Sequence, residues 1–553
     1  MDNQIHPINS SEEITISRRD LILLAGSLVV VLVFYFLFLD PVAGLFVDDA
    51  WYALLGKSLA TGQGYQLINS PTKGIFPFYP PFYPLLLSFV FRIFPDFPAN
   101  VGALKSVSIL SMMILGIVGF FYFRRYRRTS TPVALLIVLL TLLSQQLMFL
   151  VTSSLMSECV FAVLLMASLM VTERLVGQVQ LGSGSKSGIL LTVVLAAASC
   201  SALFLTRSIA IAVVIGILLY LFKARLFREA LILSLLFGLV AGSWTLYARS
   251  NSPTPEQRLE QGAIVIPYSE HFWQRTAGVN DGAVVTWRDL PQRAYENTRL
   301  IFGPNVLQIV AGPLFWVLEQ FRRDYPQAIN AIQLIGALLI SLLIVLGYVF
   351  SIRFKLTSAE ISIPFILGLI ILWPFNPIRL LAPLIPFIFY YLICGLGVAF
   401  QRLRPELDSL TAGSRLTIVA SVLLLLIVIG HGQTLLTRNE STLSSYSWGV
   451  EFGENEKLMG WISRSIPQSE VLISNNPALL TLFTGHKSVG FDVSPERWEM
   501  FRRMNLRYLV LHYYGGNEIP GLRNYPVLYR LRNTSDYRVL DLGPPESRPP
   551  LSR

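Results

Sequence analysis

Charged residues are scarce in this sequence. Asp, Glu, Lys and Arg make up only 14% of the 553 residues, whereas a soluble domain carries about a quarter. Apolar residues account for 53% of the chain, and its mean hydropathy is +0.55. These values exclude an ordinary soluble enzyme and indicate a polytopic α-helical membrane protein.

Cysteines are few, and the usual nucleotide-binding motifs are absent. The three cysteines, Cys159, Cys200 and Cys394, lie far apart inside apolar runs, which argues against a disulfide framework or a cysteine metal site. The sequence has no Walker loop, Rossmann glycine pattern or GxSxG elbow. A cytoplasmic enzyme that uses a nucleotide sugar is therefore disfavoured.

The formal net charge of +10 does not indicate a nucleic-acid partner. The basic residues form short clusters between apolar runs, for example Arg18-Arg19 and residues 124–128. This is the pattern of membrane topology, in which Lys and Arg gather in cytoplasmic connections. We therefore expect membrane lipids, and no nucleic acid, among the partners.

Apolar runs near the ~20 residues needed to span a bilayer predict about eleven transmembrane helices. The segment 83–95 is apolar but too short, and it predicts an interfacial or re-entrant helix. The predicted spans are 21–39, 101–122, 131–151, 155–172, 189–205, 208–222, 230–248, 328–350, 360–374, 378–398 and 416–434.

The basic clusters all fall on one side when these runs are threaded in order. The positive-inside rule makes that side cytoplasmic and predicts a multi-pass protein of the plasma (inner) membrane. After the last span, alternating helix and strand patterns predict a small soluble α/β domain. The predicted divisions are a cytoplasmic tail (1–20), a transmembrane domain (21–435) with extracytoplasmic loops (40–100 and 249–327), an extracytoplasmic α/β domain (436–545) and a disordered tail (546–553).

Two adjacent acids, Asp48 and Asp49, follow the first span directly. This topology places them at the outer membrane surface, where lipid-linked substrates present their phosphates. A carboxylate there can act as a general base on a hydroxyl or help to hold a metal. The alternative is a pair of solvated loop acids, and Asp49 can also cap the helix that follows.

The first loop resembles that of the GT-C membrane glycosyltransferases. The likeness is to the protein O-mannosyltransferase and lipid A aminoarabinose transferase group, glycosyltransferase family 39 and its bacterial relatives. Two later stretches are also similar to this group and place Arg207 and Arg379. The loop features that carry the resemblance are Asp48-Asp49, Tyr52, the Gly62–Tyr65 segment and the Pro80–Leu85 segment, which includes Tyr83.

The resemblance implies a polyprenyl-phosphate-linked sugar donor and transfer with inversion. It implies that Asp48 is the catalytic base and that Asp49 is a second catalytic residue, which orients the acceptor or Tyr52. The sequence departs from the group at Tyr79, where the aminoarabinose transferases have a lysine, and at Leu380, where the group has a tyrosine. Lys73 lies nearby and is a candidate substitute for that lysine, and so a further candidate ligand of the donor phosphate.

The reaction also needs cations, because negative charge grows on the leaving phosphate. Arg207 and Arg379 lie near outer ends of predicted spans and are the candidate phosphate ligands. Their alternatives are a structural pair with a buried acid, or snorkelling to the interface. The apolar helices beside residues 76–94 are expected to supply a groove for the prenyl chain.

Further candidates lie near the same surface. Glu158 can pair with an arginine, contact the sugar or, with Asp48, bind a divalent metal; no cofactor is required by the sequence. His271 lies in the long outer loop, where it can contact the acceptor, although a lone histidine is usually structural. Tyr52, Tyr79 and Tyr83 are expected to contact the acceptor or sugar, or to support the site.

These observations favour an extracytoplasmic glycosyltransferase. The alternatives are a membrane transporter or lipid flippase, and a non-catalytic GT-C-like scaffold. A transporter usually carries ionisable residues at mid-membrane and paired half-repeats, whereas this sequence carries its charges at span ends and shows no repeat. The sugar remains open, and the acceptor can be a glycolipid, a polysaccharide or a protein.

Overall fold

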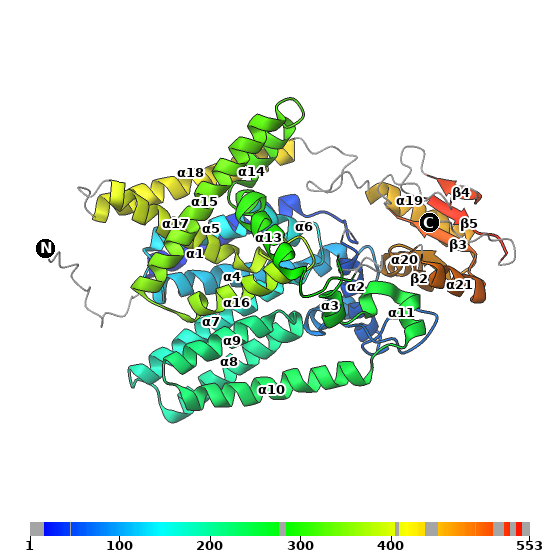
Figure 1. Cartoon of the computed structure of the whole chain (residues 1–553), viewed down its shortest axis with the longest axis horizontal. Coiled ribbons are helices and arrows are strands. Elements are labelled where there is room, and N and C mark those ends of the chain that lie inside the picture. Colours follow the sequence, from blue (N-terminus) through cyan, green and yellow to red (C-terminus); the bar gives the residue numbers. More distant parts are fainter. Residues whose placement is uncertain are drawn as a thin grey trace.

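The computed structural model describes the chain in several stretches, and the predicted tail 546–553 and most of the predicted cytoplasmic tail 1–20 lie outside them. Figure 1 shows a bundle of long helices with a small domain of strands and helices at one end. The described residues are 16–44, 46–275, 284–403, 409–436, 452–492, 494–512, 522, 525–530 and 538–544.

Within these stretches, nine helices are long and apolar enough to cross a membrane, or ten if one bent pair counts as a span. The bent pair is α5 (Thr131–Leu142) and α6 (Gln145–Thr152), which meet at 54°. The nine are α1 (Arg18–Phe38), α4 (Val101–Arg125), α7 (Glu158–Gln180), α8 (Lys186–Thr206), α10 (Phe227–Ser250), the stretch Leu290–Gln320, α15 (Pro326–Phe354), the stretch Ala382–Leu403 and Arg415–Leu436 of α18 (Ser409–Leu436).

Three segments differ from the sequence prediction. The predicted span 208–222 is the shorter helix α9 (Ala210–Lys223), which begins after the turn at Arg207. The predicted span 360–374 is the shorter helix α16 (Ser358–Leu372), which begins at a capping box on Thr357. The predicted outer loop 249–327 contains a kinked apolar stretch instead. It consists of α13 (Leu290–Leu300), η2 (Ile301–Asn305) and α14 (Val306–Gln320).

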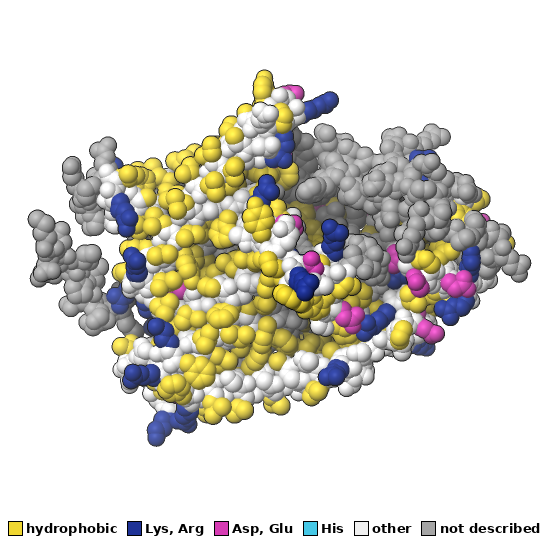
Figure 2. Space-filling view, viewed as in Figure 1, with side chains coloured by type: hydrophobic (Ala, Val, Ile, Leu, Met, Phe, Trp, Pro, Cys, Tyr) yellow, Lys and Arg dark blue, Asp and Glu magenta, His cyan; other side chains and the backbone are white. Residues whose placement is uncertain are grey.

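The surface of the bundle fits a lipid environment. Figure 2 shows hydrophobic side chains covering the bundle, with Lys and Arg gathered along its left edge. On α10, Leu231, Leu235, Leu239 and Leu246 are all more than half exposed, and their spacing places them along one helix face. In water this apolar face would be costly, so the protein is a multi-pass membrane protein.

Small residues allow some of these helices to pack closely. A Cβ atom added at Gly347 of α15 would lie 1.9 Å from the carbonyl oxygen of Tyr391, and one at Gly395 would lie 1.9 Å from that of Leu343. Tyr391 and Gly395 belong to α17 (Ile385–Leu403), so the helices in contact are α15 and α17. Helix α17 follows η3 (Ala382–Leu384). Backbone contact of this kind replaces the hydrophobic effect as a source of helix association in lipid.

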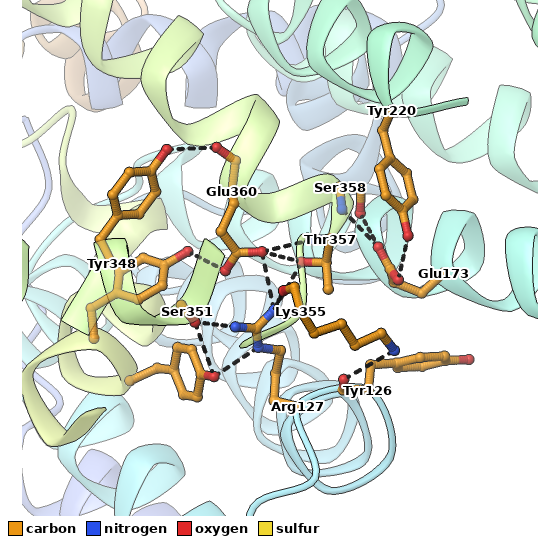
Figure 3. Close-up of polar contacts among 12 residues, drawn as sticks. Tyr126, Arg127, Glu173, Tyr220, Tyr348, Ser351, Lys355, Thr357, Ser358 and Glu360 are labelled. Carbon is orange, nitrogen blue, oxygen red and sulfur yellow. Dashed lines mark hydrogen bonds and ion pairs between the residues drawn. The ribbon is translucent and has the colours of Figure 1, made fainter. Parts of the chain in front are cut away.

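A buried polar network anchors the start of α16 (Figure 3). Arg127, from the basic cluster 124–128, forms an ion pair with Glu360 at 3.0 Å, and both side chains are almost fully buried. Glu360 also accepts a hydrogen bond from the Tyr391 hydroxyl at 2.8 Å. Breaking such a buried pair typically costs about 3–5 kcal/mol, so the network fixes α16 firmly among α15, α17 and the α4–α5 connection.

The C-terminal domain contains a five-stranded mixed sheet with strand order β2-β1-β3-β5-β4. β1 pairs in parallel with β2 and β3, and β5 pairs antiparallel with β3 and β4. The alternation of helix and strand confirms the predicted small α/β domain. Its elements are α19 (Phe452–Ser465), β1 (Leu472–Ser474), α20 (Pro477–Thr484), β2 (Ser488–Gly490), α21 (Pro495–Arg503), β3 (Tyr508–Leu511), β4 (Val527–Arg530) and β5 (Arg538–Asp541).

This domain is hydrogen-bonded to the first loop. The Ser488 backbone N–H donates to the carbonyl of Asn69 at 2.8 Å, and the Lys487 ammonium donates to the carbonyl of Ile68 at 2.7 Å. Gly44 has a φ of +90°, and a Cβ atom there would lie 2.6 Å from the side chain of Leu479. The first loop thus lies between the helix bundle and the domain.

The other short elements are α2 (Asp48–Ala60), α3 (Phe82–Ile93), α11 (Pro255–Gln261), η1 (Gly262–Val265) and α12 (Tyr268–His271).

Candidate active site

A cavity of about 610 Å³ lies where five parts of the chain meet, one of which is the segment 261–272. The first loop supplies Asp48, and the turn between α8 and α9 supplies Arg207. The connection between α16 and α17 supplies Arg379, and the C-terminal domain supplies a further wall that includes Arg497. The cavity has the size of a small-molecule site.

Asp48 is the first residue of α2 and has a half-buried side chain, 30% exposed. One carboxylate oxygen, Oδ2, lies 2.9 Å from Nη2 of Arg379. The other, Oδ1, accepts a hydrogen bond from the Tyr79 hydroxyl at 2.7 Å. The positive end of the helix dipole also favours a carboxylate at this position, so Arg379, Tyr79 and the start of α2 together hold the Asp48 side chain at the cavity wall.

The backbone just before Asp48 adopts a rare conformation. Val47 has φ +60° and ψ −49°, and the N–H of Asp48 donates to the carbonyl of Phe46 across it. This is a γ-turn with positive φ, which is strained for a β-branched residue. Strain of about 1–3 kcal/mol persists only where the surroundings enforce it, and here it sets the direction of the Asp48 side chain.

We expect Val47→Gly to keep or raise the thermal unfolding midpoint while lowering turnover about tenfold. Glycine adopts this φ without strain but lets the turn move, so the Asp48 carboxylate loses its fixed direction. Val47→Ala keeps the restriction on φ and serves as the control. Equal turnover in the glycine and alanine variants would show that the turn has no positioning role.

Asp49 points away from the cavity and is fully buried. Its Oδ2 accepts the N–H of Gly44 at 2.8 Å, and its Oδ1 accepts the N–H groups of Ala50 at 3.0 Å and Phe46 at 3.3 Å. It does not line the cavity. This geometry corrects the prediction of Asp49 as a second catalytic residue and fits the alternative, in which it caps local backbone and holds the loop.

Burial raises the pKa of Asp49 from its ordinary value to about 6, although the backbone N–H of Gly44 acts in the opposite direction. The folded protein then binds this proton more tightly than the unfolded chain, so the residue stabilises the fold at low pH and that gain is lost as the pH rises through 6. When the pH is lowered from 7 to 5, we expect the thermal unfolding midpoint of the wild type to rise relative to that of Asp49→Asn. A pH-independent difference would contradict this assignment.

Glu158 joins the two arginines of the cavity. It is the first residue of α7, its side chain is 1% exposed, and its Oε1 lies 2.8 Å from Nη1 of Arg207 and 3.1 Å from Nε of Arg379. Asp48, Arg379, Glu158 and Arg207 therefore form a chain of alternating charge. The buried carboxylate keeps both guanidinium groups at the cavity wall, where their remaining N–H donors can meet an anion.

Aromatic rings fix these groups further. The Arg379 guanidinium lies 5.3 Å from the ring centroids of both Phe46 and Phe375, a distance at which the cation is attracted to the ring. The Tyr52 ring lies 4.9 Å from that of Tyr79 and 5.1 Å from that of Tyr83. The site is thus packed against a rigid aromatic layer.

The tyrosines have different positions relative to the cavity. Tyr52 and Tyr79 line it, whereas Tyr83 is buried behind them. The Tyr52 hydroxyl lies 3.2 Å from Oγ of Ser157, which in turn accepts a hydrogen bond from Arg207 at 3.2 Å. Burial raises the pKa of Tyr52 to about 12, so it stays neutral. The Tyr79 hydroxyl instead bonds the Asp48 carboxylate.

The two remaining candidates lie in different places. His271 lines the cavity, with its ring 6.3 Å from that of Tyr268. Lys73 is exposed and does not line the cavity. The structure therefore does not place Lys73 with the other predicted phosphate ligands.

Several lining residues were missed at the sequence level. Trp51 accompanies Asp48 on α2, and a helical repeat could have suggested it. Trp373 lies after α16 and Tyr268 in α12, with ring centroids 6.0 Å apart. No local signal points to the residues of the C-terminal wall, because only the tertiary structure brings that domain to the cavity.

The donor set does not favour a resident metal. The described stretches contain no group of three or more His, Cys, Asp or Glu residues arranged to hold an ion. The two acids that the sequence offered, Asp48 and Glu158, both contact Arg379. A divalent cation would have to displace that guanidinium, so we assign no step to a metal.

The arrangement of these elements is a GT-C-like fold: a polytopic helical membrane protein with a small mixed-sheet domain after the last span. No protein-family model and no curated protein matches the sequence. Similarity is found among solved structures, at the level of the fold.

ArnT from Cupriavidus metallidurans, solved bound to undecaprenyl phosphate, is 15% identical with a TM-score of 0.51, over 95% of this chain and 98% of that one. The archaeal oligosaccharyltransferase AglB from Archaeoglobus fulgidus, solved with an inhibitory peptide and a dolichol-phosphate, is 13% identical with a TM-score of 0.52. That match covers 89% of this chain and 70% of AglB. Both similar structures thus contain a polyprenyl-type phosphate.

Proposed function

We propose that this protein is an integral membrane glycosyltransferase that moves a sugar from a polyprenyl-phosphate donor to an acceptor hydroxyl, with inversion. The observation that carries the proposal is the meeting of Asp48, Arg207 and Arg379 on one cavity. A carboxylate base and two guanidinium groups are what this reaction requires of a protein. The fold similarity to ArnT and AglB supports the same class.

In the proposed reaction, the acceptor oxygen attacks the anomeric carbon from the face opposite the phosphate. The new C–O bond forms as the bond from that carbon to the phosphate oxygen breaks, and its electron pair stays on the phosphate. Asp48 takes the proton of the acceptor hydroxyl. Its existing contacts with Tyr79 and Arg379 orient the carboxylate, although each must be weakened enough to free an oxygen for the proton.

The leaving polyprenyl phosphate gains one negative charge. Arg207 and Arg379 stabilise that charge because they already lie together on Glu158, 2.8 and 3.1 Å from its Oε1. No arginine needs to move far at the moment of reaction, so little reorganisation energy is spent. Arginine binds phosphate through a planar fork of donors, which fits a donor phosphate lying across both groups.

The proposal includes an orientation in the membrane. The basic cluster 124–128 lies in the α4–α5 connection, and the cavity lies at the end of the bundle where the C-terminal domain packs. By the positive-inside rule, the cluster faces the cytoplasm and the cavity opens on the outer face of the plasma (inner) membrane. Apolar helices beside residues 76–94 would hold the prenyl chain.

A panel of polyprenyl-phosphate sugars tests this function. Purified full-length protein in lipid nanodiscs should release the free polyprenyl phosphate from one or a few members of the panel and should be thermally stabilised by them. Protein without donor, and donor without protein, are the controls. If donors stabilise the protein but none of them is turned over, even with a crude envelope fraction as the acceptor, a transporter or a non-catalytic scaffold would be favoured instead.

A further inference from the structure

The C-terminal domain provides one complete wall of the cavity. This wall contains Asn475, Pro477, Gly490, Phe491, Asp492 and Arg497, which lie at the carboxyl ends of β1 and β2 and at the start of α21. Figure 1 shows α20, β2 and α21 beside α2 and α11. The reaction proposed above uses none of these side chains, so the wall has no role in it yet.

Arg497 is the unusual member of the wall. It is only 3% exposed, yet it lines the cavity and is ion-paired with Asp492, Nη1 to Oδ2, at 2.7 Å. Within the described part of the chain, its Nε is buried without a hydrogen-bond partner. A buried guanidinium has five donors to satisfy, and a buried donor left unpaired costs about 1–3 kcal/mol. Because Arg497 also lines the cavity, its Nη donors can serve a partner that enters there.

Two glycines lie close to the Arg497 guanidinium. Gly262 has a φ of +73°, and a Cβ atom added there would lie 3.2 Å from Nη2 of Arg497. A Cβ atom at Gly490 would lie 3.6 Å from Nη1. Both glycines line the cavity, so on these two sides the guanidinium borders backbone that carries no side chain.

The chemistry of this wall selects among ligands. The Asp492–Arg497 pair is neutral, and it offers both hydrogen-bond donors and acceptor oxygens; Asp492 is itself held by the N–H of Ser494 at 2.9 Å. The Asp492 carboxylate disfavours an anion at this pair, and an apolar chain would offer no acceptor to the N–H groups of Arg497 that Asp492 does not bind. Hydroxyl groups satisfy both members at once, and the Phe491 ring beside them can lie against the apolar face of a sugar ring.

We infer that this wall is the acceptor subsite and that it binds a carbohydrate, with Asp492 and Arg497 as its specificity-determining residues. The inference rests on the proposed function, because it assigns the acceptor to the wall that faces Asp48 across the cavity. The same sugar chemistry can come from a membrane glycolipid or from a free polysaccharide.

Binding and turnover separate the inference from the function. Full-length wild type, Asp492→Asn, Arg497→Gln and Asp48→Asn would be titrated with envelope oligosaccharides cleaved from their lipid, with the intact glycolipid fraction, and with a Ser/Thr-rich peptide, following intrinsic tryptophan fluorescence. We expect carbohydrate to bind the wild type and Asp48→Asn equally. We expect at least tenfold weaker binding in the other two variants, and a tenfold higher acceptor KM with donor KM unchanged.

Arg507→Gln is the matched control, since Arg507 pairs with Asp541 at 2.6 Å in the same domain, more than half exposed and away from the cavity. The source of the sugar is identified by comparing the affinity of the wild type for the intact glycolipid with its affinity for the released oligosaccharide. Unchanged carbohydrate binding in both wall variants, or preferential binding of the peptide, would overturn the inference. The two ideas can also fail separately. If carbohydrate binding depends on the wall but the protein turns over no donor, the inference that the wall binds carbohydrate would stand and the proposed function would be rejected.

Discussion

Asp48→Asn is expected to lower kcat by about 10³-fold, within the range typical of a lost general base. The amide has nearly the shape of the carboxylate but cannot accept the proton of the acceptor hydroxyl. A 10³-fold loss corresponds to about 4 kcal/mol of transition-state stabilisation. Donor binding should persist, because Arg379 keeps its contact with Glu158 at 3.1 Å. The measurement is single-turnover sugar transfer at saturating donor.

The control for this variant is Asp96→Asn, which changes an exposed acid of the same loop that does not line the cavity. Asp96→Asn should retain wild-type turnover. The pair of variants also tests the alternatives, since a transporter or a scaffold would be indifferent to both. Near-normal kcat in Asp48→Asn, with the fold intact, would remove Asp48 from the mechanism.

Arg379→Lys is expected to lower kcat by about 10²-fold while changing donor KM much less. Lysine keeps the positive charge but has no planar fork, so it cannot hold both Asp48 and Glu158 and still meet the phosphate. The loss should fall mainly on kcat because the leaving-group charge develops in the transition state. Turnover and donor binding would be measured on the same preparation.

Arg258→Lys is the matched control, since Arg258 pairs with Glu270 at 2.9 Å in a partly exposed position outside the cavity. That variant should behave as the wild type does. If Arg379→Lys raised donor KM and left kcat unchanged, Arg379 would contribute to ground-state binding and not to the stabilisation of the leaving group. Thermal unfolding of each variant separates such effects from loss of the fold.

Much of the fold could be predicted because its signals are local. Long apolar runs identify the membrane helices, and the alternation of short helices and strands after residue 440 identifies the C-terminal domain. The stretch Leu290–Gln320 was missed because Gly303, Pro304 and Pro313 interrupt it and its polar first turns weaken the hydropathy signal. Breakers of this kind end a helix in most contexts, whereas here the chain continues in the same stretch through kinks at Gly303 and Ala311.

The site was only partly predictable. The sequence pointed to Asp48, Arg207 and Arg379 through chemistry and resemblance, and the structure places all three on one cavity. It could not show that Asp49 faces inward, since adjacent helical residues look alike in sequence although they point in different directions. Nor could it connect Arg497 with Asp48, because residues more than 400 positions apart are brought together only by folding.

The junction between the first loop and the C-terminal domain has a consequence for engineering. The N–H of Ser488 is bonded to the carbonyl of Asn69, and Gly44, with a φ of +90°, packs against the end of the Leu479 side chain, which a larger residue would displace. A chimaera that takes only the C-terminal domain from a distant relative would therefore lose these contacts between the domain and the first loop. Segments 40–100 and 452–544 should be exchanged as one unit if substrate preference is to be transferred with them.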